Sequence, residues 1–312
     1  MKNITTLKWL LKREIWENKV LLIWSNLVLA AAILFFTVPG IFWLSESLKK
    51  TDGPHDLQIN EFATQVSHYF TSGLILFSIL LVLTMYSYAT AAFIDERKDR
   101  SILFWKSLPI SDELTVLSKV LVALILFPVM SLVTMTITTL TAMFVLCVAY
   151  AMHGISLFSV VFSVDNVWMQ IGLTLKSFPV YITWALPAIS WMIFVSSLVK
   201  SRAGMWAILI PIGLFAITAF INDIVGAAFV KNFAYAVLFR GIVSIVPDSW
   251  SYHYYLEEYS QTLSFPEAMQ HVALKVDLAS WKIFATADLW LGVIAGVAML
   301  LLAVRVRRSR GD

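Results

Sequence analysis

DERKDRSILFWKSLPISDE occupies residues 95–113, between two long stretches, residues 69–94 and 120–152, that contain no Asp, Glu, Lys or Arg. This segment mixes acidic and basic residues with an apolar patch formed by Ile102, Leu103, Trp105 and Leu108. Pro109 ends a helix, and the sequence Ser111-Asp112-Glu113 is suited to capping the next one. The pattern predicts a short amphipathic helix that another protein binds. An ordinary charged loop between two membrane spans is the alternative.

The composition around this segment is that of a membrane protein. The chain has 312 residues, of which 59% are hydrophobic and 14% charged, and its mean hydropathy is +0.80. One soluble core needs far less apolar material than this. The apolar stretches are continuous, whereas a membrane β-barrel has segments of about ten residues with alternating polarity. We therefore predict an all-α, polytopic membrane protein.

Six stretches are long enough to span a bilayer, since about 20 apolar residues cross the hydrocarbon layer as a helix. They are residues 20–45, 69–94, 120–152, 177–199, 203–222 and 283–304. Residues 1–19 have apolar side chains at helical spacing, with Trp9 and Trp16 among basic residues, which predicts an interfacial helix on the membrane surface. The alternative is a charged flank of the first span. We find no repeat or linker, so residues 1–312 are interpreted as one transmembrane domain.

A larger segment, residues 223–282, separates the fifth and sixth spans. Residues 225–247 are apolar, but Lys231 and Arg240 interrupt them. We interpret them as short helices that dip into the membrane or lie on its outer face, and a seventh span remains the alternative. The sequence Ser264-Phe-Pro-Glu267 has capping-box spacing and predicts the start of an outer helix.

The distribution of basic residues predicts the orientation of the chain. With six spans, 16 of the 23 Lys and Arg residues fall on one side of the membrane and seven on the other. The side with more Lys and Arg is normally cytoplasmic. Both termini and residues 95–113 are therefore predicted to be cytoplasmic.

Motif searches point away from an enzyme. The sequence has no phosphate loop, no H-E-x-x-H zinc motif and no G-x-S-x-G nucleophile motif, so we expect no cofactor in this chain. His253 and Glu257 have one-turn spacing, but we interpret them as loop residues and predict no metal site. The first five spans contain no ionisable residue of the kind that ion-driven carriers use, and Asp288 lies near the outer end of the sixth. The energy for any transport would then come from another protein.

A family resemblance is carried by Asp95-Glu96-Arg97, Ser101-Ile102-Leu103, the run from Lys106 to Asp112, and Ser118-Lys119. This stretch resembles the cytoplasmic segment of ABC-2-type permeases, the membrane subunits of bacterial ATP-driven exporters. The resemblance extends to the amino-terminal helix, the six spans and the large outer segment, and so to nearly the whole chain. Arg100-Ser101 stands where the family commonly has Gly-Thr.

The resemblance implies a function and a set of site residues. Residues 95–113 would be a coupling helix that seats in a groove of an ATPase subunit, with polar contacts from Glu96, Arg97 and Arg100 and apolar contacts from Phe104, Trp105 and Leu108. The implied partners are ATPase subunits that bind ATP and Mg²⁺, a second permease copy or a related permease, and membrane lipid, without nucleic acid. The implied location is the bacterial inner membrane. The alternative function is a non-transporting scaffold or sensor with a ligand-binding outer loop.

Overall fold

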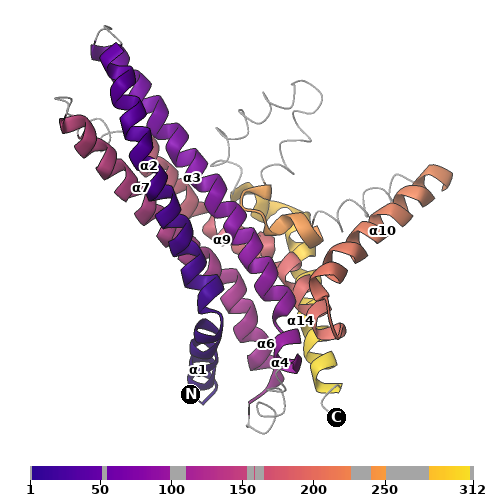
Figure 1. The fold of residues 1–312 in the computed structure, drawn as a ribbon. Helices are drawn as coiled ribbons and strands as arrows, with labels where there is room; N and C mark the ends of the chain where they lie inside the picture. Colours follow the sequence, from indigo (N-terminus) through magenta and orange to yellow (C-terminus); the bar gives the residue numbers. More distant parts are fainter. Residues whose placement is uncertain are drawn as a thin grey trace. The chain divides into compact units, whose positions relative to one another are not determined.

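The computed structural model describes residues 2–50, 55–98, 110–152, 158, 165–225, 240–250 and 281–309. These residues form helices and short connections, and none of them lies in a strand. The main helices are α1 (Lys2–Glu17), α2 (Ser25–Lys50), α3 (His55–Ala91), α4 (Ile94–Lys98), α6 (Asp112–Leu121), α7 (Phe127–Met152), α9 (Asp165–Leu198), α10 (Ala203–Val225) and α14 (Ala287–Ser309) (Figure 1). Short π-helical and 3₁₀ turns are η1 (Val20–Trp24), η2 (Val122–Leu126), η3 (Val243–Ile245) and η4 (Ile283–Ala285). The all-α prediction is confirmed for this part of the chain.

The described helices include six that are long and apolar enough to cross a membrane. They cover Val20–Val38, Ser72–Lys98, Asp112–Ala149, Ile171–Leu198, Ala203–Ile221 and Ala287–Ser309. Each overlaps one of the six predicted spans, and six apolar helices of this length are compatible with a polytopic membrane protein. The second and third helical stretches reach further into the charged segment than predicted, to Lys98 and from Asp112. The sixth starts later than predicted, because Ile283–Ala285 form the turn η4 and a bend at Thr286 separates this turn from α14.

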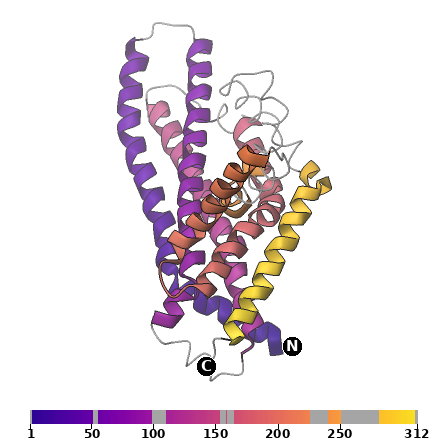
Figure 2. The same cartoon turned by 90° about the vertical axis from the view of Figure 1, so that its right-hand side faces the viewer.

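The chain divides into two compact units. Unit 1 comprises Met1–Asn18, Val82–Phe127 and Ser177–Asp312, and unit 2 comprises Lys19–Leu81 and Pro128–Lys176. Unit 2 is held by an apolar core whose buried members are Ala30, Phe77, Met135, Met143 and Cys147. The Cys147 thiol is therefore a core group, as the sequence predicts. In unit 1, α1 and the last turns of α14 lie at the same end (Figure 1, Figure 2).

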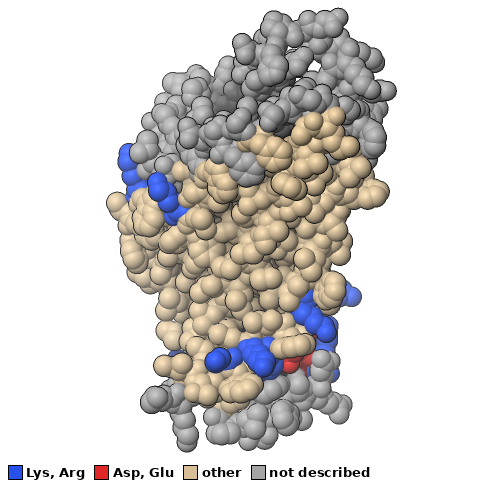
Figure 3. All heavy atoms as spheres, turned by 90° about the vertical axis from the view of Figure 1, so that its left-hand side faces the viewer, with Lys and Arg blue, Asp and Glu red and all other residues tan. Residues whose placement is uncertain are grey.

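Burial differs sharply between the helices of unit 1. In α9, which continues through Pro179 and Pro187, 61% of the membrane-length stretch is buried, whereas in α10 only 11% is. The exposed surface of α10 is apolar and includes Trp206, Leu209, Ile217 and Phe220. Figure 3 shows a different face, the left-hand side of Figure 1, on which uncharged side chains, in tan, form a broad surface and the Lys and Arg atoms lie toward its ends. Such a surface suits lipid contact rather than water.

Two glycines four residues apart let α14 lie close to its neighbours. Gly292 and Gly296 form a G-x-x-x-G pattern, which permits close approach of membrane helices. A Cβ atom at Gly296 would collide with the Leu186 side chain and would lie 3.3 Å from the Pro187 Cα on α9. The absence of a side chain at Gly296 thus sets the distance between α9 and α14.

Replacing Gly296 by Ala is expected to lower the free energy of unfolding by about 1–3 kcal/mol, because the added methyl group forces a packed helix pair apart. Gly213 in α10 is a matched control, because no atom lies within 4 Å of the position of its added Cβ. There Gly→Ala is expected to be neutral or to stabilise by up to about 1 kcal/mol through helix propensity. Thermal unfolding of both variants in one detergent, followed by circular dichroism, measures the difference. Equal effects at the two positions would contradict close packing at Gly296.

In the middle of the segment between α10 and α14, the described residues are 240–250, which pack on α9. The Tyr181 hydroxyl donates a hydrogen bond to the Ile245 carbonyl at 2.9 Å. The Trp184 indole N–H donates to the Ser249 hydroxyl, also at 2.9 Å. The predicted seventh-span alternative, the capping box from Ser264 and the pair His253 and Glu257 lie mainly or wholly outside the described residues. No group of three or more metal-ligating side chains is found within the described part.

Candidate functional site

The two ends of the charged segment form short helices with identifiable boundaries. α4 starts at Ile94 after a two-residue turn that follows α3. α6 starts at Asp112, and the Ser111 hydroxyl accepts a hydrogen bond from the Leu114 N–H at 3.3 Å. The predicted cap at Ser111 is therefore confirmed. Residues 99–109, between these ends, lie outside the described residues.

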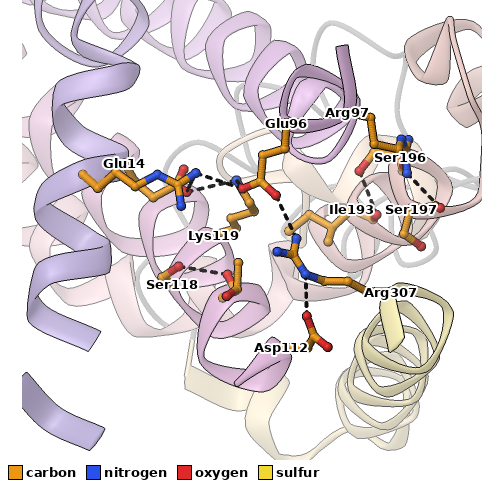
Figure 4. A network of polar contacts seen from close by, with 12 residues as sticks. Glu14, Glu96, Arg97, Asp112, Ser118, Lys119, Ile193, Ser196, Ser197 and Arg307 are labelled. Carbon is orange, nitrogen blue, oxygen red and sulfur yellow. Dashed lines mark hydrogen bonds and ion pairs between the residues drawn. The ribbon is translucent and has the colours of Figure 1, made fainter. Parts of the chain in front are cut away.

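Charged side chains from four helices meet beside these two ends. We call this group the charge cluster, and it consists of Arg13 and Glu14 from α1, Glu96 from α4, Asp112 and Lys119 from α6, and Arg307 from α14 (Figure 4). It contains three carboxylates and three cations, so its formal charge is balanced. All six residues belong to unit 1.

Glu96 is the centre of the charge cluster. Its side chain is only 6% exposed. One carboxylate oxygen lies 2.9 Å from Arg13 Nη2 and 3.1 Å from Lys119 Nζ, and the other lies 2.8 Å from Arg307 Nη1. Three cations from three different helices therefore share a single carboxylate.

Glu14 provides the second buried anion. It is 1% exposed and lies on the inward face of α1, one turn after the buried Leu10. Its carboxylate accepts hydrogen bonds from Lys119 Nζ at 3.0 Å and from the Tyr88 hydroxyl at 2.8 Å. Trp9 and Trp16 remain exposed on α1. The placement of α1 on a membrane surface stays a prediction.

Aromatic and acidic groups complete the surroundings of the cations. Arg307 Nε donates to the Asp112 carboxylate at 2.7 Å. The Phe93 ring lies 5.1 Å from the Arg307 Cζ and 5.6 Å from the Lys119 Nζ, which gives both cations a favourable π-face.

Arg13 lies outside the apolar spans and stays charged. Burial alone would lower the pKa of Arg13, but hydrogen bonds to Glu17 and Glu96, together with the nearby Glu14 carboxylate, raise it above its ordinary value. Arg13 Nε donates to Glu17 at 2.9 Å on the exposed side of α1. Arg13 thus connects the surface of α1 with the buried charge cluster.

Arg97, next to Glu96, binds a different element. Its guanidinium donates to the Ser196 carbonyl at 2.5 Å, to the Ser197 carbonyl at 3.2 Å and to the Val199 carbonyl at 2.6 Å. These carbonyls are at the carboxyl end of α9, where a cation also complements the helix dipole. Arg97 thereby ties α4 to the short connection between α9 and α10.

The predicted site residues divide into two sets. Glu96 and Arg97 are described, and both bind other parts of this chain, an arrangement that the sequence analysis did not anticipate. Arg100, Phe104, Trp105 and Leu108 lie outside the described residues, so their predicted contacts are not tested. The sequence analysis also missed Glu14, although an acidic residue on the apolar face of α1 is a signal for a buried partner. Lys119, at the start of an apolar run, is a similar signal.

Two ion pairs nearby are exposed and therefore different in kind. Arg308 pairs with Glu113, and Lys98 lies 4.0 Å from Asp95. Exposed pairs of this type contribute little to stability, whereas removal of one partner of a buried pair is costly. They offer matched controls for the charge cluster.

Comparison with known proteins adds no relative. No protein-family model, no curated protein and no solved structure matches this chain. The functional argument therefore rests on the six apolar helices and on the geometry of the charge cluster.

Proposed function

We propose that this chain is a permease subunit of an ABC-2-type exporter, to which separate ATPase subunits dock through residues 95–113. The ATPase subunits would bind ATP and Mg²⁺, and this chain would form the transmembrane path. The observation that carries the proposal is the charge cluster, which anchors both ends of the segment to helices distant in sequence.

The anchoring matters because the motion of a docked ATPase has to reach the membrane helices and not only the segment that it binds. Glu96 and Arg97 hold the first end of the segment, and Asp112 and Lys119 hold the second. Through these contacts, the first end is joined to α1, α9 and α14, and the second end is joined to α1 and α14. A displacement of the residues in between would therefore be passed to several helices of unit 1 at once. A flexible charged loop would lack this property.

The same contacts suggest a division of roles within the segment. Glu96 and Arg97 would be positioning residues, because their polar atoms bind this chain. Contact with the ATPase would then rest on Arg100, Phe104, Trp105 and Leu108. This differs from the expectation from family resemblance, in which Glu96 and Arg97 also touch the partner.

The assembly around the chain follows from the same proposal. The exposed apolar surface of α10 requires lipid or another permease against it. We propose a second copy or a related permease as partner, in a bacterial inner membrane. The meeting of α1 and α14 at Glu96 supports placing both ends of the chain in the cytoplasm, with residues 95–113.

Replacing Trp105 by Ala is expected to weaken ATPase binding by tenfold or more, since a buried interface tryptophan typically contributes about 2 kcal/mol or more. The chain is co-expressed with candidate phosphate-loop ATPase subunits, and association and ATP-driven transport are measured in nanodiscs. Trp168→Ala is the control, because Trp168 is exposed in the first turn of α9 and has no part in the proposed docking site. Unchanged association of the Trp105 variant would contradict the docking site. A wild-type chain that binds no ATPase would favour the scaffold or sensor alternative.

A further inference from the structure

Arg240, also in unit 1, is partly buried, and its guanidinium nitrogens are fully buried in surroundings quite unlike the charge cluster. Arg240 begins the described residues 240–250, which lie beside α9 and α14 (Figure 1). Its guanidinium Cζ lies 3.8 Å from the centroid of the buried Trp184 ring. On the other side is Gly292, where an added Cβ would lie 2.7 Å from the Arg240 Cζ and 2.8 Å from Nε. The guanidinium therefore lies between an indole ring and the backbone of α14.

Among the described residues, the Arg240 side chain finds no hydrogen-bond acceptor. Nε, Nη1 and Nη2 are all buried and make no hydrogen bond. Burial lowers the pKa of Arg240 to about 10, and the field of Asp288 opposes this effect. Asp288 is exposed in the first turn of α14. Its carboxylate influences the cation at a distance, without a hydrogen bond to it.

The contrast with the other buried arginines of this unit is informative. Arg13 and Arg307 bind carboxylates, and Arg97 binds three carbonyls. A guanidinium has five N–H donors, and burying them without acceptors is unfavourable. The cation–π contact with Trp184 stabilises the charge but accepts none of these hydrogens in the plane of the fork. The donors of the Arg240 guanidinium are thus available to bind an anion.

We propose that Arg240 binds the oxyanion head, phosphate or carboxylate, of an anionic amphiphile whose alkyl chain lies along the apolar surface of α14. The planar guanidinium fork matches two oxygens of such a head. Next to Gly292, α14 exposes Trp290, Leu291 and Ile294, which supply the apolar surface. Gly292 is the sixth residue of α14, roughly 8 Å from its first residue at 1.5 Å per residue, a depth that suits a lipid head group.

The site is independent of the proposed transport function. Gly292 and Arg307 are 15 residues apart on α14, about 22 Å along the helix. Substitution at Arg240 therefore leaves the charge cluster and the coupling segment untouched. The proposal applies equally to an exporter and to a membrane scaffold.

The test uses the full chain purified in a neutral detergent. Thermal unfolding and lipid retention in native mass spectrometry are measured with dioleoyl phosphatidylglycerol, dioleoyl phosphatidylcholine, oleate and inorganic phosphate. Three variants are compared with the wild type. Arg240→Gln removes the cation. Gly292→Ala keeps the cation, but the added methyl group pushes the guanidinium out of its position. Lys282→Gln removes an exposed positive charge near the same end of α14 and serves as the control.

The expected result is a phosphatidylglycerol-dependent rise in the melting temperature of the wild type and of Lys282→Gln, with little response to phosphatidylcholine. Arg240→Gln and Gly292→Ala are expected to lose this response and to bind phosphatidylglycerol about tenfold more weakly or worse, as loss of a charge-assisted pair implies. If oleate raises the melting temperature as phosphatidylglycerol does, a carboxylate head group is sufficient for binding. Without lipid, Arg240→Gln should melt close to the wild type, because relief of the buried donors without acceptors offsets the loss of the cation–π contact with Trp184.

Three results would overturn the proposal. The first is an unchanged phosphatidylglycerol response in Arg240→Gln. The second is an equal wild-type response to phosphatidylcholine. The third is a response to inorganic phosphate that matches the lipid, which would identify a soluble anion instead of an amphiphile.

Discussion

Replacing Glu96 by Gln is expected to lower the free energy of unfolding by about 3–5 kcal/mol, the usual cost of removing one partner from a buried ion pair. Arg13, Lys119 and Arg307 all lie within 3.1 Å of the Glu96 carboxylate. The amide of Gln is neutral, and its NH₂ group would face a cation that donates but does not accept hydrogen bonds. In the variant, the three cations therefore lose the negative charge that they share. Thermal and denaturant unfolding in detergent measure the loss.

Asp95→Asn is the matched control, one position earlier on α4. The Asp95 side chain is 66% exposed, and its ion pair with Lys98 is long, at 4.0 Å. Its replacement should therefore change stability by less than about 1 kcal/mol. Equal effects of the two substitutions would show that the charge cluster does not hold α4. Under the proposed function, Glu96→Gln should also reduce ATP-driven transport more than it reduces ATPase binding, because Glu96 positions the segment and does not touch the partner.

Replacing Lys119 by Met is expected to have an effect of similar size. Lys119 Nζ lies 3.0 Å from Glu14 and 3.1 Å from Glu96, and both carboxylates are buried. Without the shared cation, these two negative charges face each other in a medium that screens them poorly. We expect a loss of about 3–5 kcal/mol in the free energy of unfolding.

Glu14→Gln in the Lys119→Met background tests the mechanism of this loss. Removing one of the two carboxylates relieves their repulsion, so the double variant should be more stable than the sum of the single effects predicts by about 0.5–3 kcal/mol. Arg308→Met is the control, since Arg308 pairs with Glu113 on the surface. Strict additivity of the Lys119 and Glu14 substitutions would contradict a shared site.

The sequence predicted the membrane helices well, because the signal for a span is local. A run of about 20 uncharged apolar residues has few alternatives to crossing the bilayer as a helix, whatever packs against it. All six predicted spans overlap described helices. The cap at Ser111 was predicted for the same reason, since a hydroxyl before an acidic first turn acts on the backbone of its own helix.

The direction in which charged side chains point was decided by the tertiary structure. The partners of Glu96 include Arg13, 83 positions before it, and Arg307, 211 positions after it. The local sequence around residues 95–98 does not show whether a carboxylate contacts a partner protein or contacts three other helices of the same chain. The expected contact of Glu96 with an ATPase was implied by the family resemblance, and the burial of Glu96 became visible only in the assembled helices.

The segment DERKDRSILFWKSLPISDE shows both sides of this division. The sequence by itself determined that residues 95–113 separate two apolar helices and that a new helix starts after Ser111, because hydropathy and capping act over a few residues. Only the tertiary structure determined that Glu96 and Arg97 anchor this segment to α1, α6, α9 and α14, and that Gly292 leaves room for Arg240. Buried charges are stable only beside their counterparts, and those counterparts are supplied by distant parts of the chain.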